Sequence, residues 1–470
     1  MRPRTSARAA LLATAVLGAA LTPVALGTPA TAAAAKHTDD FNGDGYRDLV
    51  VGDRTAPVGG KPEAGAVSVI WGSATGLNPA KRSVITENSP GIAGVAEAKD
   101  YFGAKVTSAD LNKDGYADVI ASSPGELHAD RHGTFTVLWG SKSGLTKGST
   151  YASPGSKEHT FGLDVAIGDF NADGHLDVVS VDGEFVWFLR GPFTKAGGRG
   201  TATNLDPWHG EDINAEMVVA GRVTKDGTDD FALIGFDSDT ATSRVWFYRG
   251  GRNGPAKPWK RTLPASSDLV GSSAVIADFD RNGYGDLAVG VSRSGRGGAV
   301  HVLPGTATGP AGTLRTLTQN TAGVPGSIED HDYFGYDISA ADTNGDGYPD
   351  LAVGAPNESL GDNWYATGSV SVLRGGSTGL TGKNARQYDI DTPGFTGAVS
   401  TDSAWLGTSV LLRDYNRDGR AELIAAANEV GRLHVLPGTS AGPTGTGSRT
   451  LTVAQLGLGA RAFFGAELAD

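Results

Sequence analysis

The segment Asp40-Phe41-Asn42-Gly43-Asp44-Gly45-Tyr46-Arg47-Asp48 decides the fold, because the chain repeats its pattern along almost its whole length. Side chains with oxygen atoms stand at positions 1, 3, 5 and 9, Gly stands at position 6, and an apolar run follows. Further copies begin at Asp110, Asp169, Asp278, Asp342 and Asp414, and an altered copy begins at Arg222. Successive copies start between 53 residues (169 to 222) and 72 residues (342 to 414) apart, which is typical of one four-stranded sheet per repeat.

Each copy of the loop is surrounded by the same kinds of strand. An aromatic residue followed by Gly precedes the loop, as in Phe102-Gly103 and Phe334-Gly335. An alternating strand that ends in a Gly turn comes after it, as in residues 65–72, and a weaker strand follows, as in residues 82–85. Period-two alternation between turn residues indicates strands, and no long segment has the 3.6-residue period of a helix. We predict an all-β fold, a seven-bladed β-propeller with four-stranded antiparallel blades.

The two ends of the chain predict how the ring closes. The loop at Asp40 has no aromatic-Gly strand before it, and the segment Phe463-Phe464-Gly465-Ala466-Glu467-Leu468 has no loop after it. We therefore expect this C-terminal segment to pair with the N-terminal strands within one blade. Such closure removes the free sheet edges that invite aggregation.

The repeated carboxylates predict calcium sites. Ca²⁺ takes six to eight oxygen ligands, and each loop offers side chains at positions 1, 3, 5 and 9 with a backbone carbonyl at position 7. Without a cation, several carboxylates so close together would repel one another. A simple Asx-Gly turn needs no such set of acids, and an EF-hand would need Glu at position 12 and flanking helices. We expect about six structural Ca²⁺ ions.

The expected ligands share these five loop positions, with the residue at position 7 binding through its carbonyl. They are Asp40, Asn42, Asp44, Tyr46 and Asp48 in the first loop; Asp110, Asn112, Asp114, Tyr116 and Asp118 in the second; Asp169, Asn171, Asp173, His175 and Asp177 in the third; Asp278, Asp280, Asn282, Tyr284 and Asp286 in the fifth; Asp342, Asn344, Asp346, Tyr348 and Asp350 in the sixth; and Asp414, Asn416, Asp418, Arg420 and Glu422 in the seventh. The fourth loop has Arg222 and Thr224 at positions 1 and 3, and we expect it to be metal-free, with Arg222 supplying positive charge where calcium would sit.

The N-terminal segment has the features of a secretory signal peptide. Arg2, Arg4 and Arg8 precede an apolar stretch over residues 9–26, and Ala30-Thr31-Ala32 resembles a cleavage site. Pro23 and Gly27 interrupt the apolar run, which argues against the alternative of a membrane anchor. We therefore expect residues 1–35 to be removed, residues 36–470 to form the single propeller, and the protein to be secreted. No later apolar run approaches the ~20 residues of a transmembrane segment.

Composition excludes some partners and chemistries. The net charge is −12, and the predicted signal peptide carries three arginines and no acid, so the mature chain is near −15 (−12 minus 3). A nucleic-acid partner would need a basic face instead. The absence of cysteine excludes a thiol nucleophile and Cys-ligated zinc. As a separate expectation, the protein is a monomer.

These motifs resemble the FG-GAP repeats of the integrin α-subunit propeller. The fullest match is the blade with Phe334-Gly335, the loop of residues 342–350 and Gly354-Ala355-Pro356. The resemblance extends from about Asp39 to Leu468 and implies a calcium-binding propeller. It implies little about function, because relatives of this type include adhesion receptors, lectin-like propellers and modules of secreted enzymes.

Strand order predicts which loops share a face. The Asp loops join first to second strands and the Gly-Ser turns join third to fourth strands, so both lie on one face. The opposite face is built from the loops between second and third strands and the connections between blades, which are long in blades one, two, six and seven. The candidate ligand-binding residues there are Tyr101, His128, His331, Asp362, Trp364, Tyr365 and Trp405. Aromatic rings beside polar groups would suit sugar stacking, but each of these residues could equally anchor its loop.

Catalysis has no clear signature in the sequence. Gly438-Thr-Ser440-Ala-Gly442 has the G-x-S-x-G pattern, but it falls at a turn between strands rather than at a strand-to-helix turn. The nine histidines show no zinc-binding spacing. We interpret the protein as an extracellular module for binding or adhesion to a protein or carbohydrate. A secreted carbohydrate-active enzyme, glycosidase or lyase, and an envelope-associated scaffold stay open as alternatives, because fold does not decide function.

Overall fold

The computed structural model describes Met1 and residues 34–155, 160–205, 213–237, 239–240, 242–264, 272–359, 366–396, 404–458 and 466–469. The predicted signal peptide lies outside the described residues except at Met1, Ala34 and Ala35. The candidate ligand-binding residues Asp362, Trp364 and Tyr365 also lie outside them.

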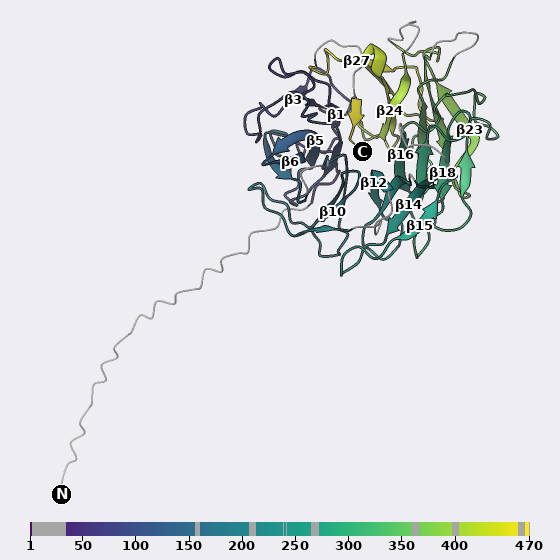
Figure 1. Cartoon of the computed structure of the whole chain (residues 1–470). Coiled ribbons are helices and arrows are strands. Elements are labelled where there is room, and N and C mark those ends of the chain that lie inside the picture. Colours follow the sequence, from purple (N-terminus) through teal and green to yellow (C-terminus); the bar gives the residue numbers. More distant parts are fainter. Residues whose placement is uncertain are drawn as a thin grey trace.

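Seven four-stranded antiparallel sheets form a ring (Figure 1), which confirms the predicted propeller. In the second to seventh blades the strands pair in chain order, with the first strand facing the central channel. These blades are β4 (Val106–Ala109), β5 (Asp118–His128), β6 (Arg131–Trp139) and β7 (Lys147–Ala152); β8 (Asp164–Gly168), β9 (Asp177–Val181), β10 (Val186–Leu189) and β11 (Ala202–Asn204); β12 (Ile213–Gly221), β13 (Asp230–Asp237), β14 (Thr242–Tyr248) and β15 (Trp259–Thr262); β16 (Ser272–Ala277), β17 (Asp286–Val291), β18 (Ala299–Leu303) and β19 (Arg315–Leu317); β20 (Ile338–Ala341), β21 (Asp350–Ala355), β22 (Ser369–Arg374) and β23 (Thr381–Tyr388); and β24 (Leu406–Arg413), β25 (Glu422–Ala427), β26 (Arg432–Leu436) and β27 (Arg449–Thr452).

The first blade joins the two ends of the chain. It contains β1 (Leu49–Asp53), β2 (Ala66–Ile70) and β3 (Arg82–Ile85), with β28 (Ala466–Leu468) as its innermost strand. β28 pairs with β1 in antiparallel register, Val51 opposite Leu468 and Asp53 opposite Ala466. The predicted closure of the ring by the C-terminal strand is confirmed.

Apolar side chains between neighbouring sheets hold the blades together. Phe102, Phe161 and Phe334 of the aromatic-Gly pairs are fully buried. The described residues form seven apolar clusters, one between each pair of adjacent blades; Val67 of the first blade and Val119 of the second belong to one of them. The described helical structure is a single 3-10 turn, η1 (Asn428–Val430), and no described helix has the length and apolarity to cross a bilayer.

The aromatic-Gly pair forms the joint between blades and ends before the first strand begins, although the sequence suggested that it lies within that strand. A Cβ atom on Gly65 would lie 2.1 Å from the Phe102 carbonyl oxygen, and one on Gly52 would lie 2.2 Å from that of Gly103. Gly65 and Phe102 form a parallel bridge between the first and second blades. Glycine is required at these positions because the two backbones are in direct contact.

We expect Leu468→Ala to destabilise the propeller, because Leu468 is 8% exposed and packs in the cluster between the seventh and first blades. Truncating a buried Leu costs about 2–5 kcal/mol. The control is Leu127→Ala at a hairpin tip, where the side chain is 56% exposed and the effect should stay within about 0.5 kcal/mol. Thermal and denaturant unfolding compare the two variants. Equal midpoints would show that β28 does not close the ring in solution.

Candidate metal centres and ligand face

The six complete Asp loops share one hydrogen-bonding pattern. The carboxylate at position 1 accepts a hydrogen bond from the Gly N–H at position 6, at 2.7–3.0 Å in every loop. The side chain at position 3 accepts from the N–H at position 5, and the side chain at position 5 accepts from the N–H at position 7, at 2.7–3.2 Å. These bonds hold the three side-chain oxygens in one compact turn.

The carboxylate at position 9 is buried at the base of each loop. In the first loop Asp48 is 2% exposed, its Oδ2 accepts from the Phe41 N–H at 3.1 Å, and its Oδ1 accepts from the Gly72 N–H at 2.9 Å. The bond to Gly72 ties the loop to the turn between third and fourth strands, so both lie on one face, as the strand order predicted. We call this the loop face.

Burial, with a smaller contribution from the neighbouring carboxylates of Asp44 and Asp40, raises the pKa of Asp48 to about 8. The equivalent carboxyls share this behaviour and its main cause. Burial raises the pKa of Asp118 to about 8, of Asp177 to about 7, of Asp286 to about 6 and of Glu422 to about 7. Each loop therefore concentrates negative charge around a buried carboxyl, an arrangement that a bound cation would stabilise.

The fifth loop brings three acidic side chains together. Carboxylate oxygens of Asp278, Asp280 and Asp286 all lie within 4.8 Å of one another. Ligands of Ca²⁺ lie about 2.3–2.6 Å from the ion, so oxygens at this separation fit a shared cation. The other complete loops have Asn at position 3 and offer an amide oxygen there.

The sixth loop carries a cation of its own. The Arg374 guanidinium donates from Nη1 to Asp350 Oδ2 at 2.8 Å, and both side chains are buried. The Thr343 hydroxyl donates to the same oxygen. The buried carboxylate of this loop is therefore partly neutralised by the protein itself.

The fourth loop departs from the pattern in the way its charges are paired. Arg222 Nε lies 3.1 Å from Asp229 Oδ1, and Arg249 Nε lies 2.8 Å from Asp226 Oδ2. Arg222 thus neutralises position 8 of the loop, and position 5 is neutralised by Arg249. The Thr224 hydroxyl donates to the buried Asp230 at 3.0 Å. Every acid of this loop has a partner within the protein.

Neighbouring loops are joined around the ring. At four of the seven places where neighbouring loops meet, the carbonyl at position 1 of one loop accepts from the N–H at position 8 of the next, as between Asp40 and Ala117 at 3.0 Å and between Asp342 and Ala421 at 2.8 Å. Position 8 of the sixth loop is Pro349, which has no N–H to donate. Arg417 in the seventh blade lies 5.4 Å from the ring centre of Tyr46 in the first. Several adjacent loops of the loop face are therefore in direct contact.

The described candidate ligand residues lie on the face opposite the loop face, which we call the ligand face. Tyr101 and Trp405 are half-buried, directly precede the blade joints and have positive φ angles of 59° and 54°. Their N–H groups donate to the preceding blade, at Glu63 O (3.1 Å) and Ala366 O (3.3 Å). Arg54 lies 4.8 Å from the ring centre of Tyr101. These two aromatics combine an anchoring backbone with a partly accessible ring.

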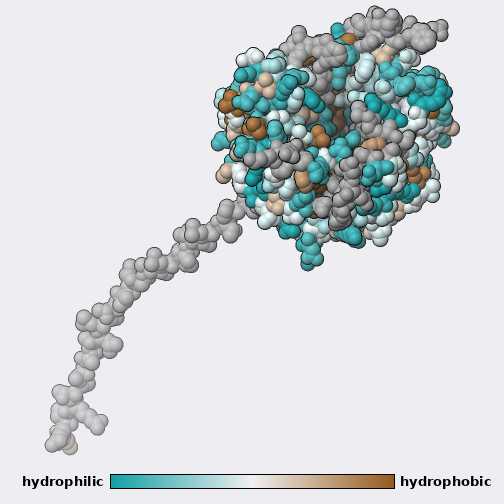
Figure 2. Space-filling model, in the orientation of Figure 1, coloured by the Kyte–Doolittle hydropathy of each residue, from teal (hydrophilic) through white to brown (hydrophobic). Residues whose placement is uncertain are grey.

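The two candidate histidines are exposed and lie in different loops. His128 stands at the tip of the hairpin between β5 and β6. His331 lies in the connection from the fifth to the sixth blade and contacts Tyr333 edge-on, with ring centres 6.2 Å apart. The four described candidates therefore come from separate loops of the ligand face. Figure 2 shows mainly hydrophilic side chains over the visible rim of the ring.

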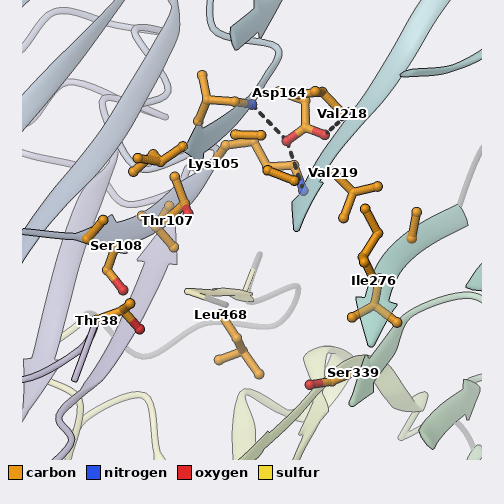
Figure 3. A pocket seen from close by; sticks show the side chains of 18 of the residues that line it. Thr38, Lys105, Thr107, Ser108, Asp164, Val218, Val219, Ile276, Ser339 and Leu468 are labelled. Carbon is orange, nitrogen blue, oxygen red and sulfur yellow. Dashed lines mark hydrogen bonds and ion pairs between the residues drawn. The ribbon is translucent and has the colours of Figure 1, made fainter. Parts of the chain in front are cut away.

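The central channel holds a cavity of about 710 Å³ lined by the first strands of the blades (Figure 3). Lys105 Nζ lies 2.6 Å from Glu467 Oε1 and 3.8 Å from Asp164 Oδ1. Asp164 Oδ2 accepts from the Val218 N–H of the next blade at 2.9 Å. The charged groups at the channel mouth bind one another and the backbone, so they serve to join the blades.

Two groups of acids on the ligand face were not predicted from the sequence. One group is Glu87, Asp100 and Glu126, and the other is Glu329, Asp332 and Glu358. Each has carboxylate oxygens within 4.8 Å of one another. Their members are far apart in sequence, and the signal that could have found them is a fixed offset from the aromatic-Gly pair.

Comparison with known proteins agrees with the repeated motifs. The FG-GAP repeat model matches residues 270–303 and 334–373, and the FG-GAP-like repeat model matches residues 40–121 and 110–180. The chain is an FG-GAP repeat protein. Its integrin-like seven-bladed propeller follows from the same repeats and from the seven sheets of the structure.

Relatives of this FG-GAP propeller include larger proteins. Phosphatidylinositol-glycan-specific phospholipase D of Rattus norvegicus is 31% identical over 171 residues, covering 35% of this chain and 19% of the relative. The Dictyostelium discoideum protein of that name is 25% identical over 293 residues, covering 55% and 25%. Integrin alpha-5 of Xenopus laevis is 27% identical over 257 residues, covering 50% and 23%. The matched regions span about a fifth to a quarter of each relative. The solved structure of the Dos1 propeller superimposes with a TM-score of 0.45 and 9% identity, covering 81% of this chain and 79% of that one.

We expect Asp44→Ala to remove one bound calcium ion and to reduce the rise in melting temperature that calcium produces. Asp44 occupies position 5 of the first loop, and Asp226 occupies the same position in the fourth, where Arg249 binds it. Asp226→Ala is therefore the matched control and should leave the number of bound ions unchanged. Equilibrium dialysis with elemental analysis measures that number. If Asp44→Ala binds as many ions as the unaltered chain, the first loop is not a calcium site.

Proposed function

We propose that this FG-GAP propeller is secreted, binds calcium through its loop face, and acts as an extracellular binding or adhesion module through its ligand face. The observation that carries the proposal is the contrast between the two faces. Six loops keep one hydrogen-bonding pattern on the loop face, while the connections on the ligand face differ in length and in side chains. Loops that vary on a rigid scaffold are the usual place for recognition.

The connections between blades set the shape of the ligand face. Residues 86–105 and residues 318–337 are the longest, with 20 residues each between the flanking strands. The second of these enters the sixth blade from the fifth, a long connection that the sequence had not singled out. Tyr101 and His331 lie in these two connections. The proposed ligand site therefore extends over them and over the neighbouring connection that carries Trp405.

The relatives support an extracellular role and leave the ligand open. Integrin alpha-5 and the phosphatidylinositol-glycan-specific phospholipases D carry related repeats, and the name of the latter gives phosphatidylinositol-glycan as what they are specific for. The ligand we propose is a protein or a carbohydrate. An enzymatic site on the ligand face would need acids in an open cleft about 5–10 Å apart. The described acids that meet there are closer and largely buried, so they do not favour catalysis.

The test incubates the calcium-loaded mature chain, residues 36–470, with polysaccharides and cell-envelope fractions, scoring retention and released fragments. We expect retention without fragments, and a loss of at least about tenfold in affinity in Trp405→Ala, as for a central aromatic at an interface. Trp259→Ala is the matched control, since Trp259 lies in the outer strand β15 and is 38% exposed. Released fragments would establish the enzyme instead, and the absence of both retention and fragments would favour a protein partner or a scaffold.

A further inference from the structure

The two acidic groups of the ligand face are copies of one arrangement. Glu87, Asp100 and Glu126 lie 15 residues before, 2 before and 24 after Phe102 (102 − 87, 102 − 100 and 126 − 102). They stand where the connection between the first and second blades meets the end of β5. We call this group the first acidic cluster.

The second acidic cluster repeats these offsets around Phe334. Gln319, Asp332 and Glu358 lie 15 before, 2 before and 24 after it (334 − 319, 334 − 332 and 358 − 334), and Glu329 adds a third carboxylate. The two clusters also share a hydrogen bond from the backbone to an Asp side chain. Asp100 accepts from the Glu97 N–H, and Asp332 Oδ2 accepts from the Glu329 N–H at 2.7 Å.

Both clusters bury negative charge that no cation of the protein neutralises. Glu87 and Asp100 are 3% exposed, and Asp332 and Glu358 are 2% and 5% exposed. None of the ion pairs formed among the described residues includes a member of either cluster. Buried carboxylates this close together require either protons or a cation between them.

Buried oxygen atoms without a hydrogen-bond partner stand in both clusters. Glu87 Oε2 is buried and accepts no hydrogen bond from any described residue, although the side chain is among the deepest in its connection. Gln319 is 2% exposed, and its Oε1 likewise has no partner, whereas its Nε2 donates to Glu358. Buried oxygens are normally satisfied, so these two atoms are available to a bound ligand.

A third copy of the joint is apolar at the equivalent positions. At the connection from the sixth to the seventh blade, these positions are Ile390, Ala404 and Val430. Ala404 and Val430 stand 2 before and 24 after Leu406, which forms the same parallel bridge as Phe102, and Ile390 follows the first residue of the turn, as Glu87 does. Ala404 is buried in the apolar cluster there, with Val430 packed against it. The fold therefore accommodates this joint without any of the three acids.

The geometry points to a second class of calcium site: Glu87, Asp100 and Glu126 hold one Ca²⁺, and Glu329, Asp332 and Glu358 hold another, with Gln319 beside the second. The carboxylate oxygens of each cluster, within 4.8 Å of one another, are the hard ligands that Ca²⁺ prefers. Each ion joins a 20-residue connection to a residue at or just after the end of the second strand of the next blade. The inference does not depend on the Asp loops of the loop face or on the proposed ligand.

The decisive variant transplants the apolar joint. E87I/D100A/E126V copies residues that the same fold already accommodates between the sixth and seventh blades. Native mass spectrometry at neutral pH counts the Ca²⁺ ions bound to the mature chain. We expect this variant to bind one ion fewer than the unaltered chain, Q319I/D332A/E358V to bind one fewer, and their combination to bind two fewer.

A second variant keeps the test decisive if the transplant does not fold. E87Q/E126Q preserves the size of both side chains and removes their charge, and we expect it also to bind one ion fewer. Asp44→Ala provides the independent comparison, because its loss of an ion from the loop face should add to these losses. Unchanged ion counts in the folded variants would overturn the inference and show that the acidic clusters share protons instead of metal.

Discussion

Each blade of this propeller depends on a buried carboxylate at position 9 of its loop. Asp48 accepts from the Phe41 N–H at the start of the loop and from the Gly72 N–H at the turn between third and fourth strands. One side chain therefore ties the Asp loop to that turn. The altered fourth blade keeps this residue as Asp230, with bonds to Val223 and Gly250. A carboxylate buried to this degree is costly unless its charge is compensated. The carboxylate that ties the loop to the strands therefore creates the need for a positive group in or near the loop.

Compensation is achieved in more than one way around the ring. In the fourth loop the Thr224 hydroxyl donates to the buried Asp230, and in the sixth loop Arg374 pairs with the buried Asp350. The remaining loops have no comparable buried arginine among the described ion pairs and present oxygens from several side chains to the same point. Because the first, third, fourth and sixth loops bond to the next loop through their position 1 carbonyls, a cation in one of them would restrain its neighbour as well. This coupling is a physical reason for adjacent blades to retain the pattern together.

The sequence predicted the fold well because its repeats are local. Asp loops, aromatic-Gly pairs and alternating strands lie within one repeat, and the unmatched segments at the two ends fixed the closure that β28 and β1 show. The Asp loops were predictable for the same reason. The acidic clusters were not, because Glu87 and Glu126 belong to different blades and meet only when the ring forms. The role of Tyr101 was also hidden, since its ring is half-buried by a joint that depends on contact between two backbones.

The two acidic clusters link the scaffold to the surface that it presents. A 20-residue connection normally has considerable conformational freedom. If a ligand binds only the ordered form of the connection, the entropy lost on ordering weakens the binding. Residues 86–105 and 318–337 each include an aromatic-Gly joint and carry acids of one cluster beside it. The shorter connection from the sixth to the seventh blade has apolar packing around Ala404 instead. With the proposed ions bound in the acidic clusters, the calcium concentration would control the order of two parts of the ligand face and leave the third unchanged.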